Sequence, residues 1–286
     1  MPSGESRELA PGLYLVATPI GNLEDITLRA IRVLKQADLI ACEDTRQTQK
    51  LLNHYGISTR TISYHEHNEI SRAAELVKEL EKGLRIAVVT DAGMPGVADP
   101  GFRLTALAIE HGIPVVPIPG PAAFVAALVA SGLPVESFSF RGFLPAKSGA
   151  RRRALEKLRS SLETEIFYEA PHRIREALGD VTEVLGPARP VVVARELTKI
   201  HEEFLRGTAA QILEDLKGRE VIKGEITLLI GPGAEGETQA PVGSIRDRVE
   251  QIMREENVDE KTALKKVAKE RRVSKSEAYR ELQKIK

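Results

Sequence analysis

Hydrophobic and polar positions along the chain form a repeating pattern of short apolar runs and amphipathic stretches. Apolar runs at 12–17, 39–41, 84–89 and 113–118 are typical of buried strands, and helical spacing follows each of them after a loop. This repeated order of strand, loop and helix predicts a parallel sheet covered by helices. Asp25 stands where the N-cap of the first helix is expected, and Leu28, Ile31 and Leu34 follow at helical spacing.

A long Gly- and Pro-rich loop at 90–101 separates one of these strands from a helix predicted over 102–110. Open α/β sheets bind ligands at the carboxyl ends of their strands, which is where this loop lies. Loops of this length inside compact α/β units are usually functional. The pattern therefore predicts a ligand site at this loop.

A second series of strands follows a helix predicted over 122–130 and closed by Gly132. Its strands are predicted at 138–143, 165–168, 190–194 and 226–230, with an antiparallel neighbour at 203–207. The expected fold is α/β, with an N-terminal lobe at 12–134 and a C-terminal lobe at 135–232. A linker at 233–244 and a helical domain at 245–286 complete the expected organisation.

The C-terminal helical domain carries an excess of positive charge. From Ser244 onward there are 13 Lys and Arg residues against 9 Asp and Glu residues. One helix places Ala263, Leu264, Val267 and Ala268 on a single face, Val273 marks a turn, and a capping box of Ser274 and Glu277 begins a second helix. Two interpretations are open: a helix-turn-helix that binds nucleic acid, or a helical hairpin that packs on a partner subunit.

Composition limits the classes of function. Lys plus Arg and Asp plus Glu are 41 each, so the overall charge predicts no polyanionic partner. The single cysteine, Cys42, excludes an internal disulfide framework and favours a reducing compartment. The six histidines show no metal-ligand spacing, and no apolar run is long enough for a signal peptide or a membrane span. These observations predict a soluble cytoplasmic protein without a metal or a membrane partner.

The loops also limit the ligand. No G-x-x-x-x-G-K-[ST] motif is present, and no G-x-G-x-x-G opens the first helix, so a nucleotide with phosphates is not favoured. Small apolar loops with the carboxylate of Asp91 suit a ligand with an adenosine, a carboxylate and an ammonium. Asp91 either binds a ribose or amino group or caps the backbone amides of its own loop.

Six motifs in order carry a family resemblance: LVATPIGNLEDIT (15–27), EDTR (43–46), DAGMPG (91–96), PGPAA (119–123), EAPHR (169–173) and RELTK (195–199). Together they resemble the ribosomal RNA small subunit methyltransferase I family, within the tetrapyrrole (corrin/porphyrin) methylase superfamily. The resemblance covers residues 12–232, and the tail resembles the helical domain of that family. It implies two α/β lobes with S-adenosylmethionine in the cleft between them, a homodimer, and 2′-O-methylation of a cytidine ribose in the decoding region of 16S ribosomal RNA.

The resemblance also assigns cofactor-binding positions by motif. These are Ile20, Gly21, Asp91, Gly93, Met94, Ala122, Ala123, Tyr168 and Leu197. Ala122 and Ala123 stand where relatives use a Thr or Ser hydroxyl, so only backbone contacts carry over at these two positions.

Candidate catalytic and RNA-binding residues lie on other loops. A ribose hydroxyl is a weak acid, so a base near it is expected to help. Our hypothesis is that one of the carboxylates of Glu43, Asp44 and Glu66, or His65, assists deprotonation while Arg46 holds a phosphate. The alternative is a structural Glu–Arg network that fixes the loop. A basic stretch at the start of a predicted helix has the composition of an RNA backbone contact: Lys147, Arg151, Arg152 and Arg153. The alternative is that these are solvated charges with no RNA partner.

Two other functions remain open at this stage. The first is a tetrapyrrole methylase, which would need neither the basic stretch nor the basic tail. The second is a DNA-binding regulator whose α/β part senses a metabolite. Aromatic residues make up 4% of the chain, which disfavours recognition by base stacking, so we expect RNA to be bound through its shape and phosphates.

Overall fold

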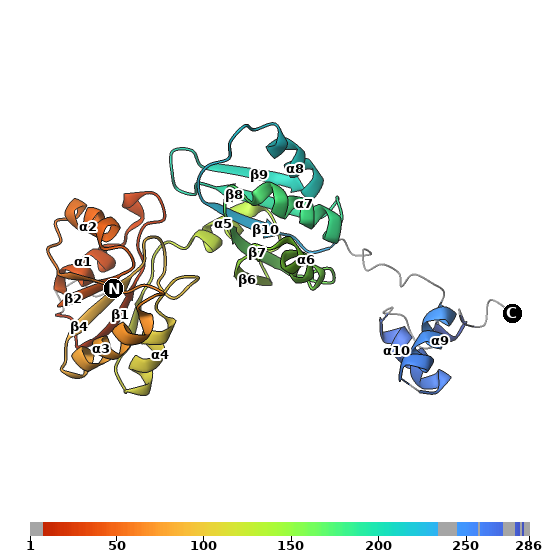
Figure 1. Ribbon diagram of the computed structural model, residues 1–286, viewed down its shortest axis with the longest axis horizontal. Helices are drawn as coiled ribbons and strands as arrows, with labels where there is room; N and C mark the ends of the chain where they lie inside the picture. Colours follow the sequence, from red (N-terminus) through yellow and green to blue (C-terminus); the bar gives the residue numbers. More distant parts are fainter. Residues whose placement is uncertain (1–7, 234–244, 257, 271–277, 281, 283–286) are drawn as a thin grey trace.

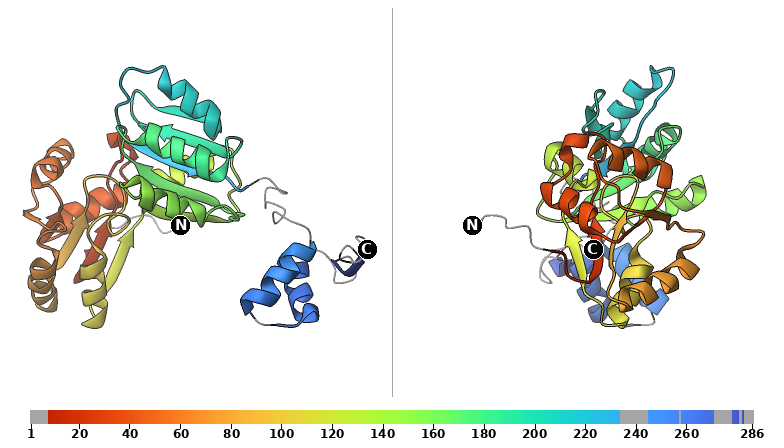
Figure 2. Two further views of the ribbon diagram at one scale, coloured as in Figure 1. Left: turned by 45° about the vertical axis from the view of Figure 1, so that its right-hand side comes forward. Right: turned by 90° about the vertical axis from the view of Figure 1, so that its left-hand side faces the viewer.

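The computed structural model describes residues 8–233, 245–256, 258–270, 278–280 and 282 (Figures 1 and 2). The first lobe contains a five-stranded sheet in the order β3-β2-β4-β1-β5. Every neighbouring pair in it is parallel, as predicted. Its strands are β1 (Gly12–Val16), β2 (Leu39–Cys42), β3 (Thr61–Ser63), β4 (Arg85–Val89) and β5 (Val115–Ile118).

Helices cover both faces of this sheet because its strands are apolar on both sides. Ala87 and Val89 of β4 pack on one face with residues of α1 (Leu28–Gln36) and α2 (Thr45–His54). Ile86 and Val88 point to the opposite face. There they pack with residues of α3 (Glu69–Glu81) and α4 (Phe102–Glu110).

The predicted N-cap at Asp25 is wrong. Asp25 ends a short 3-10 helix, η1 (Leu23–Asp25), which Asn22 caps. The side chain of Thr27 instead accepts a hydrogen bond from the Ala30 amide and caps α1. The helix therefore starts later than expected and turns a different face inward, so Leu28 is 87% exposed while Ala30 and Leu34 are buried.

The second lobe contains a mixed five-stranded sheet in the order β6-β7-β10-β8-β9. Only β6 and β7 pair in parallel, and β9 is the antiparallel neighbour of β8 that the sequence predicts. The strands are β6 (Phe138–Phe143), β7 (Thr164–Glu169), β8 (Pro190–Arg195), β9 (Glu203–Thr208) and β10 (Ile226–Ile230). One face is covered by α6 (Ser148–Glu156), α7 (Ile174–Leu185) and α8 (Ala209–Lys217).

Helix α5 (Ala123–Ser131) covers the other face of the second sheet, although it follows the first sheet in the chain (Figure 1). Leu128 packs in the same apolar cluster as Val192 and Leu229. Arg206 of β9 donates hydrogen bonds to the Ala130 and Ser131 carbonyls at 2.6 and 3.2 Å. The lobe boundary expected at residue 134 would therefore separate α5 from the sheet on which it packs.

The C-terminal unit contains α9 (Ile245–Glu256) and α10 (Glu260–Glu270). Their apolar residues form a separate cluster, in which Ala263, Leu264, Val267 and Ala268 are buried. Val273, the capping box of Ser274 and Glu277 and most of the expected linker lie outside the described residues. In the part of the chain that the structure describes, none of the helices has the length and apolar character needed to span a bilayer.

Candidate functional site

A cavity of about 290 Å³ lies between the two lobes. One wall comes from the loops that follow β1, β4 and β5, including much of the 90–101 loop. The other wall comes from the ends of β6 and β7, the residue Leu197 and the start of β10. The cavity therefore lies at the carboxyl ends of parallel strands, where the sequence predicts a ligand.

Two loops of the first lobe are held together at the cavity. Thr18 and Gly93 exchange backbone hydrogen bonds of 2.9 and 3.1 Å, and the Thr18 hydroxyl donates to the Thr90 carbonyl at 3.0 Å. Gly93 has a φ of +85°, and a Cβ there would lie 3.5 Å from Ile20 Cγ2. A glycine at position 93 thus allows the two loops to pair without strain.

The second lobe contributes an aromatic wall. Phe124 and Phe140 stack with ring centroids 4.7 Å apart. Tyr168 meets Phe140 and Phe143 edge-on at 4.9 and 5.7 Å. Burial raises the pKa of Tyr168, so its phenol stays neutral and the wall is uncharged there.

Seven of the nine predicted cofactor residues line this cavity: Ile20, Gly93, Met94, Ala122, Ala123, Tyr168 and Leu197. Gly21 is not among the lining residues. A Cβ on Gly21 would lie 2.5 Å from Lys199 Cγ and 2.8 Å from the Leu197 carbonyl oxygen. Gly21 therefore permits the close approach of the first loop to the 197–199 segment of the second lobe.

Asp91 does not line the cavity either. Its Oδ1 accepts a hydrogen bond from the backbone N–H of Asp44 at 3.3 Å, so it binds an amide of the loop after β2 and not one of its own loop. Burial raises the pKa values of Asp91 and Glu43, and Asp91 raises that of Glu43 further. The structure thus brings these two carboxylates together beside the cavity.

The other predicted catalytic residues have local roles in the fold. Asp44 is the N-cap of α2, and its carboxylate pairs with Arg46, which lowers the pKa of Asp44. The Arg46 side chain is 88% exposed. His65 Nε2 lies 3.4 Å from the Asn68 side-chain nitrogen, and no described residue hydrogen-bonds to its buried Nδ1.

Asp99 is a site residue that the sequence analysis missed. It lines the cavity between the lobes and also a second, more open cavity of about 600 Å³. Burial, with the nearby charges of Glu43 and Asp91, raises the pKa of Asp99 to about 6. The available signal was a second carboxylate in the 90–101 loop, directly before Pro100 and Gly101.

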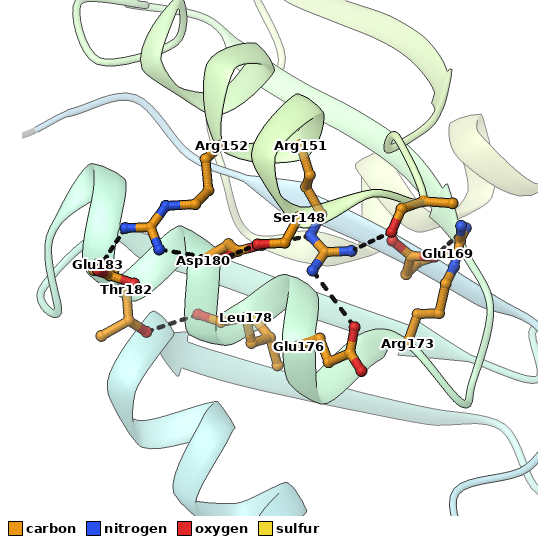
Figure 3. Close-up of polar contacts among 11 residues, drawn as sticks. Ser148, Arg151, Arg152, Glu169, Arg173, Glu176, Leu178, Asp180, Thr182 and Glu183 are labelled. Atoms are coloured by element: carbon orange, nitrogen blue, oxygen red, sulfur yellow. Dashed lines mark hydrogen bonds and ion pairs between the residues drawn. The ribbon is translucent and has the colours of Figure 1, made fainter.

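The basic stretch is only partly exposed. Arg151 is 1% exposed, and its Nε lies 2.6 Å from Asp180 Oδ2 and a terminal nitrogen 3.6 Å from Glu176 (Figure 3). The prediction that Arg151 contacts an RNA phosphate is therefore wrong. Arg152 is half-buried and pairs with Glu183 of α7, whereas Lys147 and Arg153 are exposed.

The charges around the cavity define the ligand that it suits. Among its described lining residues there is no Lys or Arg, and there are three carboxylates, of Asp99, Glu169 and Glu225. Glu169 Oε1 pairs with Arg173 at 2.6 Å, while Oε2 is buried and accepts no hydrogen bond from a described residue. A cationic ligand with N–H donors and without phosphates suits this lining.

Comparisons with known proteins agree with this architecture. The family model for Tetrapyrrole (Corrin/Porphyrin) Methylases matches residues 12–213. A ribosomal RNA small subunit methyltransferase I of Halalkalibacterium halodurans is 48% identical over 285 residues, which are 97% of this chain and 96% of that protein.

Two solved structures share the fold. A diphthine synthase superposes with a TM-score of 0.62 at 16% identity, over 77% of this chain and 89% of its own. Uroporphyrin-III C-methyltransferase of Thermus thermophilus, complexed with S-adenosylhomocysteine, has a TM-score of 0.54 at 19% identity, over 76% of this chain and 96% of its own.

Proposed function

Because the chain belongs to the ribosomal RNA small subunit methyltransferase I family of the tetrapyrrole (corrin/porphyrin) methylases, we propose that it methylates 16S ribosomal RNA with S-adenosylmethionine. The acceptor that we propose is the 2′-hydroxyl of a cytidine in the decoding region. The observation that carries the proposal is the cavity between the lobes, whose lining lacks cations among the described residues, in a chain 48% identical to a protein of that name.

The residues at the cavity fit this cofactor. S-adenosylmethionine is cationic at its sulfur and ammonium groups and has no phosphate, which matches a lining with carboxylates and without Lys or Arg in its described part. The apolar wall of Ile20, Met94 and Leu197 suits an adenine ring, and the free Glu169 Oε2 suits an N–H donor. When bound, the cofactor supplies an activated methyl group, so positioning supplies much of the rate.

The RNA contact that we propose uses the exposed part of the basic stretch and the C-terminal helices. Lys147 and Arg153 are exposed at α6 and can neutralise phosphates. Arg152 forms an ion pair with Glu183, so we expect it to contribute less to phosphate binding. Because α9 and α10 form their own apolar cluster, they can bind RNA as an independent unit.

We also propose that the protein is a homodimer, as the family resemblance implies. Apolar side chains on α5 and β6 are exposed in the single chain, among them Val129 at 72% and Phe143 at 56%. These exposed apolar side chains are the surface that we propose the partner subunit covers. Light scattering at micromolar concentration tests the dimer: a mass near twice 31.4 kDa is expected, and a monomer mass contradicts it.

Nucleoside mass spectrometry tests the reaction. Purified protein and S-adenosylmethionine are incubated with small ribosomal subunits from cells that lack the modification, and the RNA is digested. We expect new 2′-O-methylcytidine in a decoding-region fragment. A methyl group on another nucleoside would refute the acceptor but not the class of enzyme.

A tetrapyrrole methylase is the second candidate, because the family model and the uroporphyrin-III C-methyltransferase share this fold. The same assay with a porphyrinoid acceptor separates the two: methylation of the porphyrinoid and not of the subunit would favour it. Tight binding to duplex DNA without turnover of either acceptor would favour a regulator.

A further inference from the structure

The second cavity adjoins the first at a single strained point of the 90–101 loop. Ala98 and Asp99 line both cavities. Ala98 has a φ of +62°, a conformation that non-glycine residues adopt rarely and mostly where the surrounding structure imposes it. The carboxylate of Asp99 forms no hydrogen bond or ion pair with any residue that the structure describes. It is therefore a free acceptor that lines both cavities.

The second cavity has the size and the hydrogen-bonding groups for a single nucleotide. Its volume of about 600 Å³ exceeds that of the first, and it is open to solvent. Glu43, Glu66, Glu69 and Glu110 line it together with Arg103 and the exposed ring of Phe102. These carboxylates accept hydrogen bonds from the hydroxyl and amino groups of a nucleotide, and Arg103 is a cation at the same cavity for the phosphate next to the 2′-hydroxyl.

We propose that Asp99 is the catalytic residue that receives the proton of the acceptor hydroxyl, with the target nucleoside in the second cavity. This inference rests on the proposed function. The ribose O–H bond breaks and its proton goes to the Asp99 carboxylate. The oxygen forms a bond to the methyl carbon as the methyl–sulfur bond breaks, and the electron pair of that bond stays on sulfur.

The position of Asp99 distinguishes it from the residues predicted from sequence. Glu43 lines the second cavity but not the first, and His65 lines neither. Asp44 and Arg46 pair with each other at the start of α2. A group that acts on the bond between cofactor and acceptor must be reachable from both sides, and Asp99 is.

The surroundings of Asp99 keep the pKa of its carboxyl group in a range suited to a general base. The charged and titratable groups that face it from the packed elements are Glu43, Glu66, Glu69, Asp91, Arg103, Glu110, Tyr168, Glu169 and Glu225. Burial and the negative neighbours raise the pKa of Asp99 to about 6. Such a carboxylate is a stronger base than an ordinary aspartate and is still ionised at pH 7.5.

The test compares the wild type, Asp99→Asn, Asp99→Glu and the matched control Asp215→Asn, which changes an exposed carboxylate on α8. Single-turnover methyl transfer to small subunits, cofactor affinity by calorimetry and subunit affinity are measured for each. We expect Asp99→Asn to slow transfer by about 10²–10³-fold, with subunit affinity within about twofold of wild type. Cofactor affinity should fall by much less than the rate, because Asp99 is one of three carboxylates at the cofactor cavity. Asp99→Glu should recover part of the rate, and Asp215→Asn should match the wild type.

Two other results for Asp99→Asn would overturn the proposal. Transfer by Asp99→Asn within about threefold of wild type would remove Asp99 from proton transfer, and loss of cofactor affinity would make it a binding residue. If Asp99→Asn does not fold, the pH profile of the wild type decides. The rate should fall tenfold per pH unit below pH 6, and a flat profile from pH 5 to 8 would refute the role.

A failure of the proposed function can be distinguished from a failure of the role of Asp99. In that case the wild type transfers no methyl group to the subunit, whatever residue stands at position 99. A readout independent of turnover is the pH dependence of the stability of the free protein, which reports the ionisation of Asp99 without cofactor or RNA.

Discussion

Replacing Arg151 with alanine should destabilise the second lobe strongly, although the residue stands in a basic stretch that looks suited to RNA. The Arg151 and Asp180 side chains are 1% and 9% exposed, and their Nε–Oδ2 ion pair is 2.6 Å long. Removing one partner of a buried pair costs about 3–5 kcal/mol. The Ser148 hydroxyl, 3.2 Å from Asp180 Oδ2, and the Arg152 guanidinium, 3.9 Å from Asp180 Oδ1, remain beside the carboxylate, so we expect the lower end, about 3 kcal/mol.

Urea unfolding followed by far-UV circular dichroism measures this loss, with Arg153→Ala as the exposed neighbouring control. The control should change the free energy of unfolding by less than about 0.5 kcal/mol. Because the chain has several units, hydrogen exchange of α6 and α7 should confirm that the loss is in the second lobe. A loss below about 1 kcal/mol for Arg151→Ala would refute the reasoning, since it would mean that Asp180 is not desolvated.

Three further predictions concern the site and the RNA contact. Asp99→Asn should stabilise the free protein above pH 6, because a raised pKa means that folding disfavours the carboxylate. Asp99 is only half-buried, so screening by solvent keeps the gain to about 1 kcal/mol, and the gain in thermal melting should shrink as the pH falls toward 4. Gly21→Ala should cost about 1–3 kcal/mol and weaken cofactor binding in calorimetry, because its Cβ would overlap the Leu197 carbonyl. Lys147→Ala and Arg153→Ala should each lower the salt dependence of subunit binding by about one unit of log–log slope, and an unchanged slope would exclude a phosphate contact.

Sequence patterns predicted the elements well where one periodicity dominates. The helix over 102–110 and the helix closed by Gly132 were found because a glycine or a Gly/Pro loop marks their ends. The cap of α1 was misplaced because Asn22, Asp25 and Thr27 are all competent caps within six residues, and tertiary packing of Ala30 and Leu34 decides among them.

The site also contains some residues that sequence patterns could predict and others that they could not. Motif positions identified the residues of the loops after β1, β4 and β5, because parallel strands bring their carboxyl ends together. The burial of Arg151 was not predictable, since its partner Asp180 is 29 residues away on another helix. Asp99 was missed because it is distinguished only by lining two cavities, and the first of these forms only when both lobes are folded.

Helix α5 has a consequence for how the protein is made. The helix is completed at Ser131, but its apolar cluster needs β7, β8 and β10, and β10 ends at Ile230. Chains emerge from the ribosome with the N-terminus first, at about 5–20 residues per second. The nascent chain therefore carries an apolar helix without its covering sheet for about 5–20 s. Its synthesis should depend on a chaperone that holds apolar helices, even though the first lobe is complete by then.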